Sequence, residues 1–226
     1  MTYRGFTKAQ IAAFIDHTVL KPSASTKDIE DAVAIAIDSQ VAAVCFRPSD
    51  MTLAKRLLGN SKIGLATVVG FPHGTNESSV KAFETRLAVE QGANEIDMVL
   101  HIGHLIEGKD DLVQADIAAV VEAAGSALVK VILETSELND EQIVTACKLS
   151  EAAGAGYVKT STGFASGGAT THAVSLMAKA VPALGVKASG GIKTLDQLID
   201  MVEAGATRVG ASGTKSILEE FDQKLV

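Results

Sequence analysis

Three lysines lie inside short apolar segments that are typical of buried strands. Moving an isolated ammonium from water into a protein interior costs several kcal/mol or shifts its pKa. A lysine in such a segment therefore indicates a charged partner or a chemical role. A neutral amine is a nucleophile toward carbonyl groups. A cluster of these lysines therefore predicts Schiff-base chemistry, with one amine uncharged near neutral pH. The three are Lys130 in segment 128–133, Lys159 in segment 155–163 and Lys187 in segment 185–191.

Two aspartates and a threonine lie in other strand-like segments: Asp97 in one, and Asp16 with Thr18 in another. Retro-aldol cleavage needs an amine that forms an iminium and a second group that takes the proton from the substrate hydroxyl. A carboxylate can relay that proton through water, so Asp97 facing the lysines would complete the set. A structural alternative stays open, in which Asp16, Asp97 or Glu134 only hold the lysines as buried ion pairs.

Strand and helix patterns alternate along the chain after a short N-terminal helix over 8–14. Such alternation implies a parallel sheet, and eight strand–helix units of roughly 25 residues favour a closed (β/α)8 TIM barrel of the α/β class. No Gly-x-Gly-x-x-Gly follows the first strand, which argues against a dinucleotide-binding fold. No linker divides the chain, so we predict a single domain over residues 1–226. Strands are expected over 15–20, 41–46, 63–70, 95–100, 128–133, 157–159, 186–188 and 208–210, and helices over 26–39, 49–58, 76–91, 111–124, 139–153, 170–181, 194–203 and 214–221.

The barrel predicts where the lysines point, because barrel strands turn alternate side chains inward and outward. If Val158 and Val186 pack outward, Lys159 and Lys187 both point into the barrel on neighbouring strands. The same parity turns Lys130 inward. Lys187 close to Lys159 would lower the pKa of the latter, because like charges disfavour each other. Active sites of these barrels lie at the carboxyl ends of the strands, where both lysines are expected.

Glycine-rich loops follow the last strands, at 189–192 and at 210–213. In barrels of this kind the loops after strands seven and eight, together with a helix N-terminus, commonly bind phosphate through backbone N–H groups. The segment 160–163, Thr-Ser-Thr-Gly, could add hydroxyl and amide donors. The loops therefore predict a phosphorylated substrate.

The histidines and cysteines do not predict a metal site or a second nucleophile. His73, His101 and His104 do not have the spacing of a recognised ligand set, so we expect no metal. Cys45 and Cys147 define neither a metal motif nor a disulfide framework. Both are expected to be small buried residues.

Composition narrows the class of protein. Hydrophobic residues make up 47% and aromatics only 4%, so the core must be built from Ala, Val, Ile and Leu. The net charge of −7, without a basic run, argues against nucleic acid or an anionic membrane as a partner. The N-terminus lacks an apolar leader, and no stretch approaches the roughly 18 apolar residues of a membrane span. We therefore expect a cytoplasmic location.

In order along the chain, these segments resemble the deoxyribose-phosphate aldolases, a family of class I, Schiff-base-forming aldolases. The resemblance covers nearly the whole chain, and its two lysine motifs together are specific. The matching segments are Asp16-His-Thr18, Val44-Cys-Phe46, Val68-Val-Gly-Phe-Pro72, Glu95-Ile-Asp-Met98, Lys130-Val-Ile-Leu-Glu134, Val158-Lys-Thr-Ser-Thr-Gly163, Val186-Lys-Ala-Ser-Gly-Gly-Ile192 and Arg208-Val-Gly-Ala-Ser212.

The resemblance implies reversible cleavage of 2-deoxy-D-ribose 5-phosphate to acetaldehyde and D-glyceraldehyde 3-phosphate, in deoxynucleoside breakdown. It implies no cofactor, and a homodimer. Lys159 would form the Schiff base with the acetaldehyde portion, and Asp97 and Lys187 would be the proton donor/acceptors. Supporting residues would be Lys130, Asp16 and Thr18, and the substrate phosphate would lie against Gly163, Gly190, Gly191, Gly210 and Ser212.

The chain departs from the family pattern at two places. Phe164 stands where some members carry a lysine, so phosphate binding is expected to depend more on backbone donors. The chain ends in Leu225-Val226 rather than in the terminal tyrosine that some members use to move the enamine proton. Two alternatives stay open: another Schiff-base barrel, such as a transaldolase-like or keto-acid aldolase, and a phosphosugar-binding barrel without catalysis.

Overall fold

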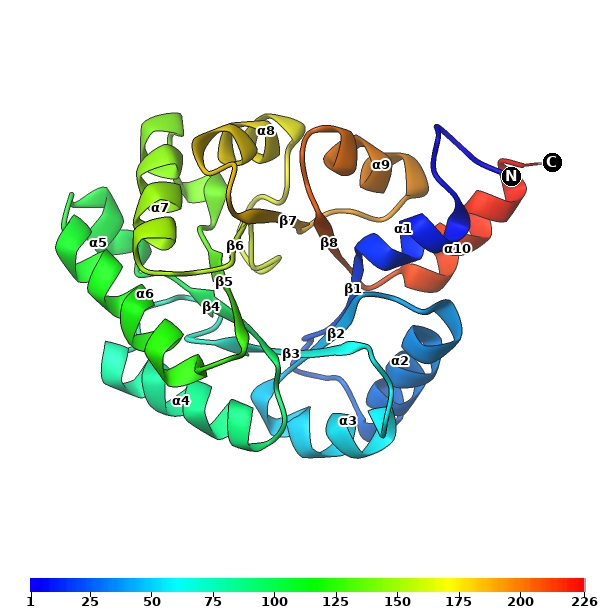
Figure 1. Ribbon diagram of the computed structural model, residues 1–226, viewed down its shortest axis with the longest axis horizontal. Coiled ribbons are helices and arrows are strands. Elements are labelled where there is room, and N and C mark those ends of the chain that lie inside the picture. Colours follow the sequence, from blue (N-terminus) through cyan, green and yellow to red (C-terminus); the bar gives the residue numbers. More distant parts are fainter. Residues whose placement is uncertain (226) are drawn as a thin grey trace.

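The computed structural model describes residues 1–225 and shows a closed barrel surrounded by helices (Figure 1). Parallel strands pair in chain order, and β8 pairs with β1 to close the ring. The predicted (β/α)8 barrel is therefore confirmed. One domain over residues 1–226 stays a prediction, and Val226 lies outside the described residues. The strands are β1 (Ile15–Val19), β2 (Ala43–Phe46), β3 (Gly64–Val69), β4 (Glu95–Val99), β5 (Leu128–Ile132), β6 (Tyr157–Lys159), β7 (Gly185–Ser189) and β8 (Arg208–Ala211).

The helices form the outer layer of the barrel, and α1 (Lys8–Phe14) precedes β1 as predicted (Figure 1). The pattern along the sequence missed α5 (Ile102–Ile106) and two 3₁₀ turns over Pro48–Asp50 and Thr135–Glu137, because such short elements do not establish a periodicity. Within residues 1–225 no helix is long and apolar enough to cross a membrane. The other helices are α2 (Thr26–Ser39), α3 (Met51–Leu58), α4 (Ser78–Glu90), α6 (Asp110–Ala124), α7 (Asp140–Ala152), α8 (Thr171–Ala180), α9 (Leu195–Glu203) and α10 (Thr214–Gln223).

Local sequence fixes where the helices begin and end. Ser25 and Asp28 form a reciprocal capping box at the start of α2, and the same arrangement opens α1, α7 and α9. After α4, α7 and α9 the chain reverses at Gly92, Gly154 and Gly205, whose φ angles are 102°, 86° and 117°. Glycine adopts positive φ without steric cost, so these residues allow a tight return to the next strand.

The core has two parts that differ in position. A large apolar cluster lies between the outer face of the strands and the helices, and Val158 and Val186 belong to it, as predicted. A small cluster of Cys45, Ala66 and Val68 fills the inner face of β2 and β3. The interior on the side of the remaining strands holds charged side chains instead. The barrel is thus packed with apolar groups on one side and built as a polar site on the other.

The strand register brings the charged residues to the same part of the barrel. Lys159 lies opposite Lys187 across β6 and β7, and Lys187 lies opposite Arg208 across β7 and β8. On the other side of β6, Asp97 lies opposite Lys130 across β4 and β5. Register partners in a parallel sheet point to the same face, so these side chains meet inside the barrel.

Candidate active site

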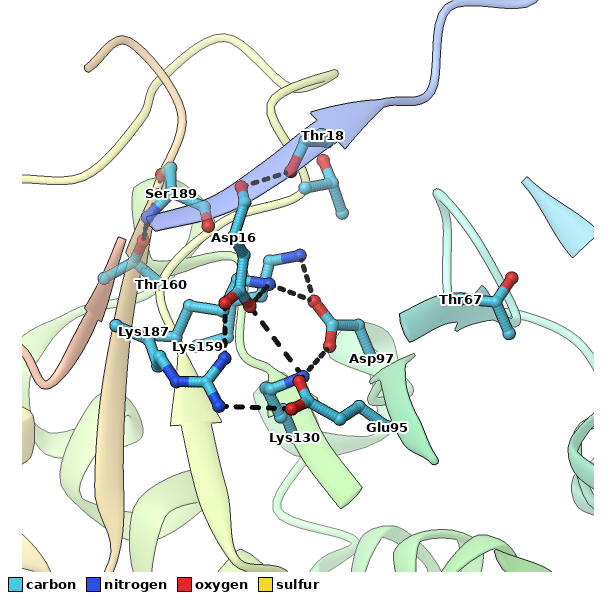
Figure 2. Close-up of polar contacts among 12 residues, drawn as sticks. Asp16, Thr18, Thr67, Glu95, Asp97, Lys130, Lys159, Thr160, Lys187 and Ser189 are labelled. Carbon is cyan, nitrogen blue, oxygen red and sulfur yellow. Dashed lines mark hydrogen bonds and ion pairs between the residues drawn. The ribbon is translucent and has the colours of Figure 1, made fainter. Parts of the chain in front are cut away.

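Asp97 is the centre of the charged cluster (Figure 2). Its Oδ1 accepts a hydrogen bond from Lys130 Nζ at 2.8 Å, and its Oδ2 accepts from Lys159 and Lys187, also at 2.8 Å. All four side chains are buried. The predicted inward direction of the three lysines is confirmed, and one carboxylate joins them.

A second set of carboxylates lies deeper in the barrel. Asp16 Oδ2 lies 2.5 Å from Lys187 Nζ and Asp16 Oδ1 lies 2.5 Å from Arg208, while Thr18 donates to the Asp16 carbonyl at 3.0 Å. Glu95 contacts Lys130 at 2.6 Å and Arg208 at 3.1 Å. Figure 2 shows the Asp16 and Glu95 side chains directed toward the same lysines as Asp97.

Sequence reasoning gave no role to Glu95 and Arg208, although a signal for both was present. Glu95 precedes Asp97 by two residues on β4, and Arg208 precedes Gly210 by two on β8. A spacing of two places side chains on the same face of a strand. The parity that turned the lysines inward therefore also applied to this pair.

Cations outnumber carboxylates in the cluster, four to three. Lys130 contacts three carboxylates, and Lys187 and Arg208 contact two each. Within residues 1–225 Lys159 contacts only Asp97, through an oxygen that it shares with Lys187. Lys159 is thus the cation with the fewest carboxylate contacts. Its deprotonation would leave three positive and three negative charges in the cluster. The carboxylates are Asp16, Glu95 and Asp97.

The pKa values follow the same order. Burial lowers the pKa of Lys159. The attraction of Asp97 opposes this effect and the repulsion from Lys187 adds to it, so the pKa of Lys159 stays below its ordinary value. Burial also disfavours the charged forms of Lys130 and Lys187, but their carboxylate partners outweigh it and raise both pKa values. Lys159 is therefore the lysine of the cluster that loses its proton most easily.

Asp97 and Asp16 remain ionised. Burial opposes ionisation of Asp97, but Lys130, Lys159 and Lys187 outweigh this effect and hold its pKa well below the usual range. The pKa of Asp16 is also lowered, because Lys187 and other cations overcome the cost of burial. Asp97 thus stays charged and joins three amines by hydrogen bonds, along which a proton can pass from one amine to another.

Lys159 also differs from the other two lysines in its access to a cavity. A cavity of about 870 Å³ opens at the carboxyl ends of the strands, and Lys159 and Thr18 line it. Lys130 and Lys187 have no exposed surface, whereas Lys159 keeps 3%. A small molecule in the cavity would therefore meet the Lys159 amine first.

The residues predicted to bind phosphate come together in the same cavity. The loops after β6, β7 and β8 contribute its wall, and Gly163, Gly190 and Gly191 have φ angles of 83°, 90° and 81°, which favour glycine. A Cβ atom at Gly210 would lie 2.4 Å from Ser189 Oγ, so a larger residue at this position would displace the Ser189 side chain. The cavity-lining members of the predicted set are Gly163, Gly190, Gly191, Gly210 and Ser212.

Hydrogen bonds inside the loops fix this wall. Thr160 Oγ1 donates to Ser189 O and accepts from Ser189 N, both at 3.0 Å, which ties the end of β6 to the end of β7. The Thr162 hydroxyl donates to Glu134. Glu134 thus holds the loop after β6 and not a lysine, contrary to one alternative interpretation of the sequence. The Thr160 and Thr162 hydroxyls serve the loop itself.

Phe164 lies at the mouth of the cavity. Its side chain is 47% exposed and packs edge to face against Phe71, with ring centroids 5.3 Å apart. An aromatic ring at this position offers no charge to an anion. The loop after β6 therefore carries no side-chain cation at this position.

His101 and His104 contact each other, and both cysteines are buried. His101 Nδ1 accepts a hydrogen bond from His104 N at the start of α5, and the two rings stack 3.6 Å apart. In the described part of the chain no group of three or more His, Cys, Asp or Glu side chains has the arrangement of a metal site. Burial raises the pKa of Cys45 to about 11 and that of Cys147 to about 12, so both thiols are protonated and weakly nucleophilic.

A barrel with a buried, easily deprotonated lysine at its cavity is suited to an enzyme that acts on carbonyl compounds, and the comparisons with known proteins agree. The family model described as "DeoC/LacD family aldolase" matches residues 10–223. The chain belongs to this family of aldolases.

Individual relatives match over most of their length. The deoxyribose-phosphate aldolase of Lysinibacillus sphaericus is 54% identical over 209 residues, which are 92% of this chain and 94% of the relative. The deoxyribose-phosphate aldolase of Streptococcus gordonii is 50% identical over 207 residues, 91% and 94% of the two chains. The structure of deoxyribose phosphate aldolase from Aeropyrum pernix, described as tetrameric, superposes with a TM-score of 0.90 at 33% identity and covers 97% of this chain and 94% of its own.

Proposed function

We propose that this aldolase cleaves 2-deoxy-D-ribose 5-phosphate reversibly to acetaldehyde and D-glyceraldehyde 3-phosphate, a reaction of deoxynucleoside breakdown. One observation carries the proposal: Lys159 is the lysine of the buried cluster that lines the cavity, and the glycine loops line the same cavity. The relatives named above carry the same activity in their names.

The reaction begins with addition of neutral Lys159 Nζ to the C1 aldehyde of the open-chain sugar. The carbinolamine loses water and leaves an iminium, which stores the electrons released later. A proton must reach the departing hydroxyl, and we assign its supply to Lys187, whose Nζ lies 2.8 Å from the Asp97 oxygen that also binds Lys159. The proton that the amine sheds during addition passes along Asp97, which is hydrogen-bonded to both lysines, and returns to Lys187.

Carbon–carbon cleavage follows when the C3 hydroxyl loses its proton, through water, to the pair of Asp97 and Lys187. The C2–C3 electron pair then moves to the iminium and forms an enamine, and C3 leaves as the aldehyde of D-glyceraldehyde 3-phosphate. Asp97 and Lys187, through water, return the proton to C2 of the enamine. Water finally adds to the new iminium and releases acetaldehyde and the free Lys159 amine. Lys130, Asp16 and Thr18 support this pair by fixing its position and charge.

The phosphate of the substrate is assigned to the loops after β6, β7 and β8. Backbone N–H groups in glycine-rich loops bind phosphate without side-chain cations, and α10 directs its N-terminus toward the loop after β8. Phe164 fits this arrangement, because its uncharged side chain cannot pair with the phosphate and the backbone N–H groups remain as donors. The proposed contacts are Gly163, Gly190, Gly191, Gly210 and Ser212.

We also propose a homodimer. Val80, Phe83 and Leu87 are spaced by three and four residues on α4, and their side chains are 43%, 61% and 42% exposed. An exposed apolar stripe of this kind suits burial against a second copy of the chain. Light scattering of Phe83→Glu tests the assignment: a monomer is expected, and an unchanged oligomer would remove α4 from the interface.

Borohydride trapping with acetaldehyde tests the chemistry, with intact mass and peptide mapping as the readout. An ethyl group on Lys159 that is lost in Lys159→Ala is expected. A label on Lys187 would exchange the roles of the two lysines, and no adduct on folded protein would refute the acetaldehyde donor. Release of D-glyceraldehyde 3-phosphate from 2-deoxy-D-ribose 5-phosphate, followed with a coupled dehydrogenase, tests the substrate.

A further inference from the structure

Arg47, which directly follows β2, lies outside the buried cluster and has no part in the reaction described above. Its guanidinium uses all five N–H donors. Nε and Nη2 bind the Asp50 carboxylate at 2.6 and 3.1 Å. The remaining donors bind three backbone carbonyls of one loop, those of Lys21 at 3.1 Å, Pro22 at 3.0 Å and Ala24 at 3.0 Å.

The loop that Arg47 holds is a wall of the substrate cavity. It connects β1 to α2 over residues 20–25, and Lys21, Ser23 and Ala24 line the cavity together with the end of β1. Inside this loop the backbone makes one hydrogen bond of its own, from Ala24 N to Lys21 O at 3.0 Å. Arg47 therefore supplies most of the hydrogen bonds that define the loop conformation.

Lys21 places an available cation on this wall. Among residues 1–225 its ammonium forms no ion pair, whereas the two carboxylates on the same side of the cavity are already bound. Asp28 accepts from Ser25 at 2.7 Å, and Asp31 pairs with Lys27. Hydrogen bonds from Ser25 and the charge of Lys21 lower the pKa of Asp28, but no carboxylate of residues 1–225 contacts the Lys21 ammonium, so a negatively charged group in the cavity can bind it.

We propose that Arg47 is a positioning residue, which holds loop 20–25 as a fixed wall and thereby keeps the Lys21 ammonium in place for the phosphate of the substrate. The inference rests on the proposed function and adds a side-chain contact to the backbone phosphate site. Lysine cannot replace Arg47, because one ammonium has three donors and lacks the planar fork that reaches Asp50 and three carbonyls together.

The test compares 2-deoxy-D-ribose 5-phosphate with unphosphorylated 2-deoxy-D-ribose. Arg47→Met is expected to raise KM for the phosphorylated sugar about tenfold, the loss of one charge-assisted contact, with kcat within about twofold. For 2-deoxy-D-ribose, kcat/KM should change by less than about twofold. Arg47→Lys should behave like Arg47→Met, and Arg56→Met, on the exposed face of α3, is the control that should match wild type.

Lys21→Met separates the cation from the loop. It should raise KM for the phosphorylated sugar as much as Arg47→Met does, and the double variant should be no worse than either, because both changes remove the same contact. The proposal is overturned if Arg47→Met lowers kcat/KM equally for both sugars, or if Lys21→Met leaves the preference for the phosphorylated sugar unchanged.

Amide hydrogen exchange keeps the test independent of the proposed substrate. The amides of Ala24 and Ser25, which donate to Lys21 O and to the Asp28 carboxylate, should lose protection in Arg47→Met and Arg47→Lys and keep it in Lys21→Met and Arg56→Met. If wild type does not cleave 2-deoxy-D-ribose 5-phosphate, the proposed function fails, and unchanged exchange in Arg47→Met would separately refute the positioning role. If Arg47→Met does not fold, Asp50→Asn weakens the same arrangement and should shift KM in the same direction by a smaller factor.

Discussion

Lys187→Met removes the ammonium that lies opposite Lys159 and is expected to make Lys159 harder to deprotonate. Both Nζ atoms lie 2.8 Å from the same Asp97 oxygen, so they are at most about 5.6 Å apart, and at an effective dielectric of about 20 two unit charges at that separation repel by about 3 kcal/mol. Loss of this repulsion raises the pKa of Lys159. The neutral fraction of the amine near neutral pH should fall about 100-fold.

The assay is borohydride trapping of acetaldehyde across a series of pH values, because Schiff-base formation can be followed without complete turnover. The midpoint of trapping should move to higher pH in Lys187→Met. Lys187→Arg is the matched control, since it keeps the charge and should keep the midpoint near that of wild type. Coincident curves for wild type and Lys187→Met would refute the argument that Lys187 keeps Lys159 neutral.

Three further changes test other parts of the structure. Asp97→Asn leaves the lysines without their shared carboxylate and should lower the free energy of unfolding by about 3 to 5 kcal/mol in urea titrations and abolish turnover; wild-type stability would contradict the central role of Asp97. His17 is buried and its pKa is lowered to about 4, so the unfolded chain binds a proton below pH 6.5 that the folded chain excludes until about pH 4. From pH 7 to pH 5 wild type should therefore lose about 2 kcal/mol more unfolding free energy than His17→Asn, and equal losses would contradict this. Gly210→Ala should raise KM for the phosphorylated sugar, and Ser189→Ala in the same chain should restore it by removing the atom 2.4 Å from the added Cβ; no recovery would place the effect elsewhere.

Much of the fold could be predicted from local patterns. Helix α2 runs from Thr26 to Ser39, and the strand β6 runs from Tyr157 to Lys159; both have the bounds predicted from the sequence. Alternation of strands and helices predicted the closed barrel, since parallel strands with intervening helices have few other solutions in this length. Side-chain parity predicted the inward direction of Lys130, Lys159 and Lys187, because it depends only on the period of two within a strand.

The sequence by itself thus determined the barrel, the inward lysines and the glycine loops at one end of it. Only the tertiary structure separated Lys159 from Lys187, whose sequence surroundings are equivalent. It placed Lys159 at the cavity, paired Lys187 with Asp16, and joined Glu95 to Arg208 across 113 residues of chain. The physical reason is that a pKa depends on distances between charges on different strands and on burial, and neither quantity is encoded in the residues adjacent to a lysine.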